Sequence, residues 1–323
     1  MKPNILCLLA LIFLSNSCKT ENNTMFDPEL NPEQLEVFGQ DYISTPLHER
    51  DITISSDGNQ LVYTLGNYKQ TVRSLVSIKK TGDKWGDKEI LPFSGKYNDI
   101  EPFFTVDGTK LFFASNRPMG EDSTRSDYNI WYVEQENGKW KTPIALDTLV
   151  NSPGDEFFPS VSSNGNLYFT ATRENGIGRE DIFVSTFSKD KYGVAVPLDS
   201  AINTKAYEFN AYISPDEDLL VFSSYGRADG LGGGDLYYSK KDKTGQWGKA
   251  QNLGEVVNSD KLDYCPFIDF PRNNFYFTSD RAKAPEERIK TVPELTNEAN
   301  KVLNGMGNIY RINLDELNLN QQR

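Results

Sequence analysis

Short apolar runs recur along this chain in pairs, and a turn of the Asp-Gly type separates the two runs of each pair. The turns are Asp57-Gly58, Asp107-Gly108, Asn164-Gly165 and Asp216-Glu217. Residues of these types tolerate left-handed backbone geometry, so each pair of runs predicts a β-hairpin. An acidic residue begins the first run, and in four copies an arginine follows the second.

The hairpins belong to a larger unit that recurs at a spacing of roughly 50–57 residues, the range typical of propellers and solenoids. The units begin at Glu49, Asp99, Glu156, Glu208 and Asp263. A third apolar run follows each hairpin, and a short fourth run follows an aromatic residue, as Ile144 follows Trp140. Four strands in each radially repeated unit predict an all-β fold, a single five-bladed β-propeller.

The two ends of the chain complete this prediction. The last unit stops after its third run, near Leu314, whereas a strand-like segment from Leu35 to Ile43 precedes the first hairpin. We expect this N-terminal strand to close the last blade, because closure removes an exposed sheet edge. A six-bladed ring is the alternative, but residues 18–47 are too few for another blade. An insertion between Arg281 and Gly305 predicts a short helix that begins at Pro293.

The N-terminus indicates export. Lys2 precedes an apolar stretch from Ile5 to Leu14, which is shorter than the ~20 residues that span a bilayer and fits a signal peptide. The segment Leu14-Ser15-Asn16-Ser17-Cys18 resembles the lipobox of bacterial lipoproteins, and that resemblance implies a lipidated (palmitate-bearing) Cys18. An ordinary cleaved signal is the alternative. The domains expected are a signal peptide (1–17), a flexible tether (18–34), the propeller (35–318) and a tail (319–323).

Charge and cysteine content narrow the possible partners. The formal net charge of −12 argues against nucleic acid and against electrostatic docking on anionic lipid. Membrane contact is therefore expected through the N-terminal lipid only. Of the three cysteines, Cys7 lies in the signal and Cys18 carries the lipid. Cys265 then has no disulfide partner and is expected to be a small core residue.

The repeat also resembles a known family. The run Asp-Gly-x-x-Leu-x-Phe-x-Ser-x-Arg stands at Asp107–Arg117, and a later unit carries Gly234-Asp235-Leu236-Tyr237. These motifs resemble the TolB-type β-propeller repeat over about residues 44–315, and their longer form is similar to repeats in envelope lipoproteins of Bacteroidetes. The resemblance implies an outer-membrane lipoprotein. It does not imply one activity, because members include scaffolding proteins, peptidases and a lyase.

Strand order places the acidic unit starts and the loops after each second strand at one end of the ring, called here the loop face. An acid that opens one strand should meet the arginine that closes the next, which predicts one structural ion pair per blade. The pairs expected are Asp99 with Arg117, Glu156 with Arg173, Glu208 with Arg227, and Asp263 with Arg281.

Departures from the repeat mark candidate binding residues. The first unit has Asn67-Tyr68 where the others have arginine, so Glu49 is expected to lack an arginine, and His48 stands beside it. The residue two positions after each unit start varies. Asp51 and Glu101 stand at this position in adjacent units and are candidates for a carboxylate cluster. The candidate binding set is Glu49, Asp51, Asp99, Glu101, Asn210 and His48. Clustered carboxylates suit general acid chemistry or the binding of calcium, and the alternative interpretation is a solvated acidic rim.

Several classes of enzyme are excluded. The sequence has no Gly-x-Ser-x-Gly motif for a serine hydrolase, and its one histidine rules out multi-histidine metal sites. We therefore expect no cofactor and a non-catalytic, lipid-anchored envelope propeller that binds a protein or glycan through an acidic loop face. The alternative is a carbohydrate-active enzyme, a glycoside hydrolase or lyase, that uses Asp51, Glu101 and Glu156 at the channel mouth.

Overall fold

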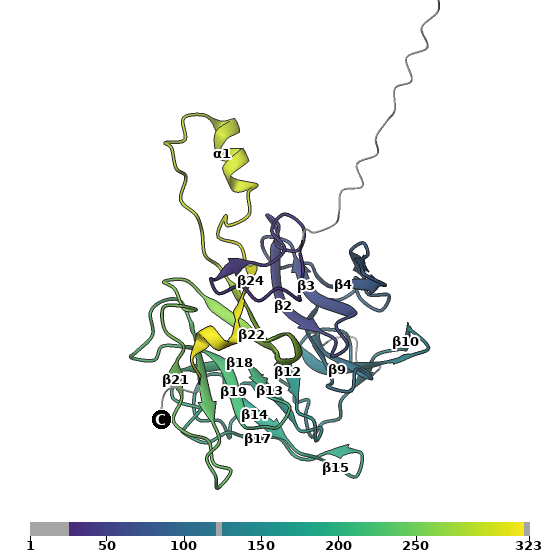
Figure 1. Ribbon diagram of the computed structural model, residues 1–323. Coiled ribbons are helices and arrows are strands. Elements are labelled where there is room, and N and C mark those ends of the chain that lie inside the picture. Colours follow the sequence, from purple (N-terminus) through teal and green to yellow (C-terminus); the bar gives the residue numbers. More distant parts are fainter. Residues whose placement is uncertain (1–25, 121–124, 320–323) are drawn as a thin grey trace, which may run out of the picture.

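The computed structural model describes residues 26–120 and 125–319, which form a ring of five antiparallel blades (Figure 1). The expected signal peptide and Cys18 lie outside the described residues. The five-bladed all-β prediction is confirmed, because each repeat unit forms one sheet. Among the described residues, no helix has the length and apolar character needed to cross a membrane.

Blades 1 to 4 run from an innermost to an outermost strand in chain order. Blade 1 holds β2 (His48–Ile54), β3 (Gln60–Gly66), β4 (Arg73–Thr81) and β6 (Glu89–Ile90). Blade 2 holds β7 (Asp99–Phe104), β8 (Lys110–Ser115), β9 (Asn129–Glu136) and β11 (Ile144–Ala145). Blade 3 holds β12 (Glu156–Val161), β13 (Leu167–Ala171), β14 (Asp181–Ser185) and β17 (Val196–Pro197). Blade 4 holds β18 (Tyr207–Ile213), β19 (Leu219–Tyr225), β20 (Asp235–Lys240) and β21 (Gln251–Asn252).

Blade 5 joins the two ends of the chain, as the sequence predicts. It holds β22 (Asp263–Asp269), β23 (Asn274–Ser279), β24 (Asn308–Asn313) and, as its outermost strand, β1 (Glu36–Val37). In β1, Glu36 lies opposite Arg311, and the fully buried Phe38 that follows packs edge-on against Tyr276 at 5.1 Å. Part of the segment expected to be a tether also packs on the ring, since Phe26 is buried and its ring lies 5.7 Å from Phe38.

Short elements extend the blades. The strand extensions are β5 (Lys84–Trp85), β10 (Lys139–Trp140), β15 (Phe187–Ser188) and β16 (Lys191–Tyr192). The 3-10 turns are η1 (Phe270–Arg272) and η2 (Leu314–Leu317).

A bulge interrupts all five innermost strands at the same point. The pairing register with the second strand shifts there, and one residue has a positive φ. These residues are Asp51 (60°), Glu101 (60°), Phe158 (50°), Asn210 (50°) and Cys265 (55°). A β-bulge re-aims the side chain of the extra residue. The structure uses this repeat of bulges to bring five unlike side chains to the ring centre.

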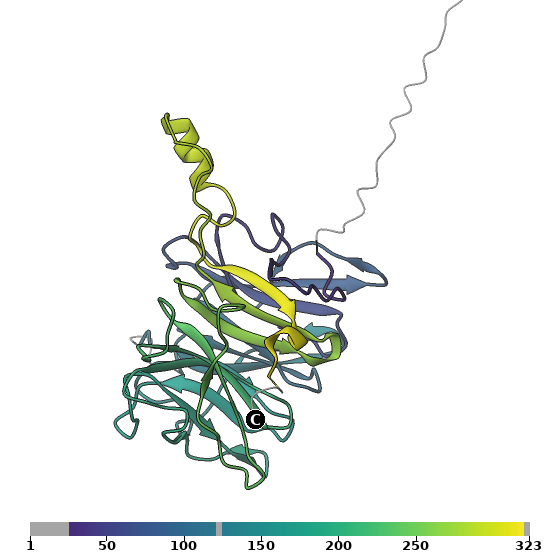
Figure 2. The ribbon, with the colours of Figure 1, turned by 60° about the vertical axis from the view of Figure 1, so that its left-hand side comes forward.

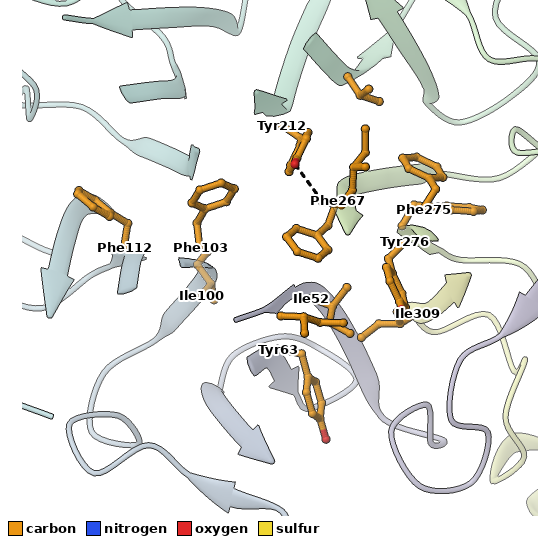
Figure 3. Close-up of a cluster of buried hydrophobic side chains, with 14 of the residues drawn as sticks. Ile52, Tyr63, Ile100, Phe103, Phe112, Tyr212, Phe267, Phe275, Tyr276 and Ile309 are labelled. Atoms are coloured by element: carbon orange, nitrogen blue, oxygen red, sulfur yellow. Dashed lines mark hydrogen bonds between the residues drawn. The ribbon is translucent and has the colours of Figure 1, made fainter. Parts of the chain in front are cut away.

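Aromatic side chains fill the ring below the bulges. Phe103, Tyr212 and Phe267 come from β7, β18 and β22 and point toward one another (Figure 3). The ring of Tyr212 lies 6.1 Å from Phe103 and 5.8 Å from Phe267, and its hydroxyl donates to the carbonyl of Ile268 at 3.0 Å. The centre of the ring is thus packed core on the side of the Asp-Gly turns.

The insertion between β23 and β24 forms an arm, defined here as residues 282–305, that stands away from the blades in both views (Figures 1 and 2). Its helix α1 (Val292–Ala299) begins at a Thr291–Glu294 capping box with Pro293 in the first turn. The helix ends at Ala299, and the side-chain amide of the next residue, Asn300, donates to the carbonyl of Thr296 in the last turn.

Candidate functional site

Four of the five unit-opening acids face an arginine from the same blade. The shortest distances are 2.6 Å for Asp99–Arg117, 2.9 Å for Glu156–Arg173, 3.0 Å for Glu208–Arg227 and 3.2 Å for Asp263–Arg281. All five acids, Glu49 included, have no exposed surface. They therefore do not form an exposed acidic rim on the loop face.

A hydroxyl residue four positions earlier binds most of these acids as well. In blade 3 the Ser152 hydroxyl and backbone amide donate to Glu156 at 2.5 and 3.0 Å, and Thr204 and Ser259 do the same for Glu208 and Asp263. With Thr45 before Glu49, this explains the Ser or Thr that stands four positions before four of the five acids in the sequence. Burial raises the pKa of Glu156 and Asp263 and outweighs the hydrogen bonds and the arginines, which lower it.

Blade 1 satisfies its acid without an arginine. Glu49 accepts from the amide and hydroxyl of Thr45 at 2.9 and 2.5 Å and from the side-chain amide of Asn308 at 3.3 Å. The neighbouring His48 is also buried, and its Nε2 lies 3.0 Å from the amide nitrogen of Gln70. Consecutive strand residues project to opposite faces, so His48 and Glu49 do not form an acid–base pair. Burial lowers the pKa of His48 to about 4.

Asp51 and Glu101, the candidate carboxylates at the bulges, meet at Arg50. Its Nε lies 2.7 Å from the Asp51 carboxylate, and its Nη2 lies 2.7 Å from Oε1 of Glu101. The same guanidinium stacks over the ring of Tyr264 at 5.1 Å. We call Arg50, Asp51, Glu101, Asn210 and Cys265 the central cluster.

The remaining bulge residues complete the central cluster. The amide of Asn210 donates to Oε1 of Glu101, and the thiol of Cys265 donates to Oδ1 of Asn210, both at 3.5 Å. Arg50 also donates to the Cys265 sulfur at 3.4 Å. Asp51, Glu101, Asn210 and Cys265 are 1–5% exposed. The cluster is therefore an internal polar network in which each carboxylate already has a cationic partner.

Glu101 also replaces a residue of the repeat. In blades 1, 3 and 5 the hydroxyl oxygen of a threonine on the second strand accepts a hydrogen bond from the backbone amide of the bulge residue in the next blade. Thr64, for example, accepts from the amide of Glu101 at 3.1 Å. Blade 2 has Ala114 at that position, and the amide of Phe158 instead donates to Oε2 of Glu101 at 2.7 Å. The carboxylate thus supplies an acceptor that the backbone of blade 3 would otherwise lack.

Burial controls the protonation of the carboxyl groups around Arg50. Desolvation raises the pKa of Glu101 to about 7 and outweighs the opposing effect of Arg50, while the nearby Asp51 carboxylate adds to the rise. Burial also raises the pKa of Asp280, at the end of β23, to about 6. Near neutral pH the cluster can therefore take up or release a proton.

Arg50 is the residue of the central cluster that sequence reasoning missed. Aligning the five units one position after the opening acid gives Arg50, Ile100, Phe157, Phe209 and Tyr264. A single charge among apolar residues was a usable signal. Among the residues described, no group of three or more acidic, histidine or cysteine side chains is placed to hold a metal ion.

Known structures resemble the chain at low sequence identity. No protein-family model and no curated protein sequence matches it. It is similar to a structure described as TolB from Agrobacterium tumefaciens, with 16% identity over 73% of this chain and 71% of that chain and a TM-score of 0.47. It is also similar to an α-L-arabinofuranosidase from Podospora anserina, solved with cellotriose, with 12% identity, 88% and 95% coverage and a TM-score of 0.44.

A GH74 enzyme from Niastella koreensis matches with 14% identity over 72% of this chain and 33% of that chain, at a TM-score of 0.42. The expected likeness to TolB-type propellers is thus found among solved structures. The lipoprotein, signal-peptide and outer-membrane assignments stay predictions.

Proposed function

We propose that this protein is a non-catalytic, lipid-anchored propeller of the bacterial envelope that binds a partner protein through the arm on its loop face. The observation that carries the proposal is the exposure of helix α1 to solvent. The helix buries none of its residues, and Val292 and Leu295 are 76% and 55% exposed. Isolated helices of this length are marginal in water. A helix that packs against nothing in the described part of the chain therefore suits contact with a partner.

The arm is built to hold this helix in place. Lys283 and Leu303 are joined by a backbone hydrogen bond of 2.9 Å, and Ala282 bridges Asn304. The side chain of Asn304 also donates to the carbonyl of Pro46 in the neighbouring chain segment at 3.1 Å. A tied base and a capped helix present the apolar side chains at a fixed place, which lowers the entropy that binding must remove.

The candidate catalytic residues favour binding over hydrolysis. Glycoside hydrolysis needs two carboxyl groups that reach a sugar from opposite sides. Glu156 is engaged by Arg173 and Ser152, while Asp51 and Glu101 share Arg50. All three acids are buried, so none faces a substrate in this arrangement.

Photo-crosslinking tests the partner. A photoreactive amino acid at position 292 in intact cells is expected to give one adduct of defined mass, and the same group at Lys243, an exposed loop residue at the opposite end of the ring, is expected to give none. Leu295→Glu, which places a charge beside position 292, should abolish the adduct. Equal labelling at positions 292 and 243, or an adduct that survives Leu295→Glu, would reject the arm as the binding element.

The anchor is tested separately by fractionation. Cys18→Ser should move the protein from the membrane fraction to the soluble fraction, because one removed lipid site abolishes the only membrane contact that we propose. A variant that stays with the membrane would refute the lipid anchor and leave the role of the arm untouched.

A further inference from the structure

A second surface on the loop face is rich in cationic and tyrosine side chains, unlike the acidic chain as a whole. A pocket of about 830 Å³ lies between blades 3 and 4. Its walls include Arg179 from the β13–β14 loop, Lys205 and Tyr207 at the start of β18, Tyr225 at the end of β19, and Lys249 before β21. We call it the tyrosine pocket. Its volume falls in the range of about 300–1,000 Å³ that is typical of ligand sites.

The tyrosine pocket is cationic although the whole chain carries a net charge of −12. Arg179, Lys205 and Lys249 are exposed, and within the described residues none of them forms an ion pair. Arg227 also lines the pocket, but the buried Glu208 neutralises it at 3.0 Å. Among the described residues that line the pocket, Asp229 is the one acidic residue. The remaining charge of about +2 favours an anionic ligand.

Two tyrosines give this pocket flat apolar walls. Tyr207 and Tyr225 are cross-strand neighbours in β18 and β19, with ring centroids 6.0 Å apart and planes inclined by 48°. Arg179 donates to the hydroxyl of Tyr207 at 2.9 Å and lies over its ring at 5.5 Å. Tyr225 is 50% exposed. Because both tyrosines stand on paired strands, their two ring faces are held in a fixed arrangement before any ligand binds. The hydrogen bond to Tyr207 places the guanidinium of Arg179 beside them.

We propose that the tyrosine pocket binds an acidic polysaccharide, one whose sugar rings carry carboxylates. A pyranose ring offers an apolar C–H face to an aromatic ring and hydroxyls at its edge, which matches the amphipathic tyrosines. A carboxylate on the same sugar ring can accept two parallel hydrogen bonds from the planar guanidinium of Arg179. The ammonium groups of the two lysines add positive charge without requiring one particular orientation of the ligand. The proposal goes beyond the arm-mediated function, because the pocket lies on blades 3 and 4 while the arm leaves blade 5.

Calorimetry with a defined probe tests this proposal. The probe is a hexamer of galacturonic acid, compared with the same hexamer after its carboxyl groups are reduced, titrated into the full mature chain carrying Cys18→Ser. We expect the acidic hexamer to bind at least about tenfold more tightly than the reduced one, the difference that one charge-assisted hydrogen bond supplies. Arg179→Gln and Tyr225→Ala should each weaken binding about tenfold, and Lys243→Gln, outside the pocket, should not change it.

Defined outcomes overturn the proposal. Equal affinity for the acidic and reduced hexamers, no binding of either, or binding unchanged in both pocket variants would each reject it. Competition by inorganic phosphate or by hexaglutamate at the concentration of the hexamer would also reject it, because the pocket would then be a general anion site. Urea midpoints of both variants equal to wild type show that lost binding is not lost folding. Replacing residues 284–302 of the arm should leave hexamer binding intact, which separates this proposal from the arm's function.

Discussion

Buried charge is the most unusual feature of this protein at the scale of single residues. Each paired opening acid is withdrawn from water and held by an arginine and by nearby hydrogen-bond donors, as Glu156 is held by Arg173 and Ser152. Arg173 also donates to the carbonyl of Val150 and lies over the rings of Phe169 and Phe183. The guanidinium therefore ties a loop, two strands and a carboxylate together. Removing it should cost more than the ion pair alone.

Arg173→Ala is predicted to lower the free energy of unfolding by about 3–5 kcal/mol, because it leaves Glu156 charged and unpaired in the interior. Urea denaturation at pH 7 with an unchanged m-value measures this loss. The matched control is Arg179→Ala in the same blade, an exposed arginine whose loss should change stability by less than about 0.5 kcal/mol. Similar losses of unfolding free energy in the two variants would show that the buried ion pair contributes no more to stability than an exposed arginine does.

The raised pKa of Glu101 predicts a pH dependence with a definite sign. The folded state holds this proton up to about pH 7, whereas the unfolded chain releases it near the ordinary value of 4.5. The folded state thus binds more protons in this window, and stability falls as pH rises through it. Between pH 6.5 and 8 the contribution of Glu101 should drop by about 0.8 kcal/mol.

Glu101→Gln isolates this contribution. Urea unfolding of wild type and variant is compared at pH 6.5 and pH 8, and the difference in stability should move in favour of the variant at the higher pH. His48, whose pKa is lowered to about 4, gives an opposite slope near pH 6.5, but it is present in both proteins and cancels in the difference. A difference that does not change with pH would contradict the raised pKa.

At the scale of elements, the repeat made most of the fold predictable. Turn residues, apolar runs and the missing last strand were sufficient for the five blades and their closure by β1. The bulges were not predictable, because Asp51, Glu101 and Cys265 adopt positive φ without a glycine to mark the position. The central cluster depends on these bulges. The sequence therefore suggested Asp51 and Glu101 together and marked Arg50 only as a charge at an apolar repeat position, without showing that it lies between the two carboxylates. The tyrosine pocket escaped for a related reason, since Arg179 and Tyr225 come from different blades.

Closure of the ring by β1 can be tested at Phe38. This ring is fully buried against Tyr276 and Phe26, and Arg311 lies over it at 4.9 Å. Phe38→Ala should cost about 3–5 kcal/mol, the usual price of a large cavity in a core. Hydrogen exchange should speed up first in β24, whose edge β1 covers.

Leu30→Ala is the control for this experiment, because Leu30 precedes the same strand but is 59% exposed. It should change stability by less than about 0.5 kcal/mol. If Phe38→Ala accelerates exchange equally in all five blades, the ring unfolds as one unit and β1 is not a separate closing element.

At the scale of the whole molecule, a rigid ring carries two distinct features on one face. The centre of the ring is filled by the aromatic side chains of Figure 3 and by the central cluster, so contacts with other molecules are left to the periphery. The arm and the tyrosine pocket both lie there, on blade 5 and between blades 3 and 4. Loops on a rigid scaffold are where binding residues concentrate. The arm should accordingly be dispensable for folding.

Replacement of residues 284–302 by Asn-Gly tests that expectation. The new turn would join Lys283 to Leu303, which are already hydrogen-bonded across the base of the arm at 2.9 Å, and Asn-Gly is the favoured sequence for such a two-residue connection. Since α1 buries no residue, the melting temperature should change by less than about 2 °C, equivalent to under 1 kcal/mol for a domain of this size. The adduct expected from position 292 is lost by design, so binding is followed by copurification of the partner that the adduct identifies. A shortened protein that melts as wild type but no longer copurifies the partner would separate the binding role of the arm from folding. A large fall in melting temperature would instead show that the arm is a structural part of blade 5. That result would remove the argument that the exposed helix serves a partner.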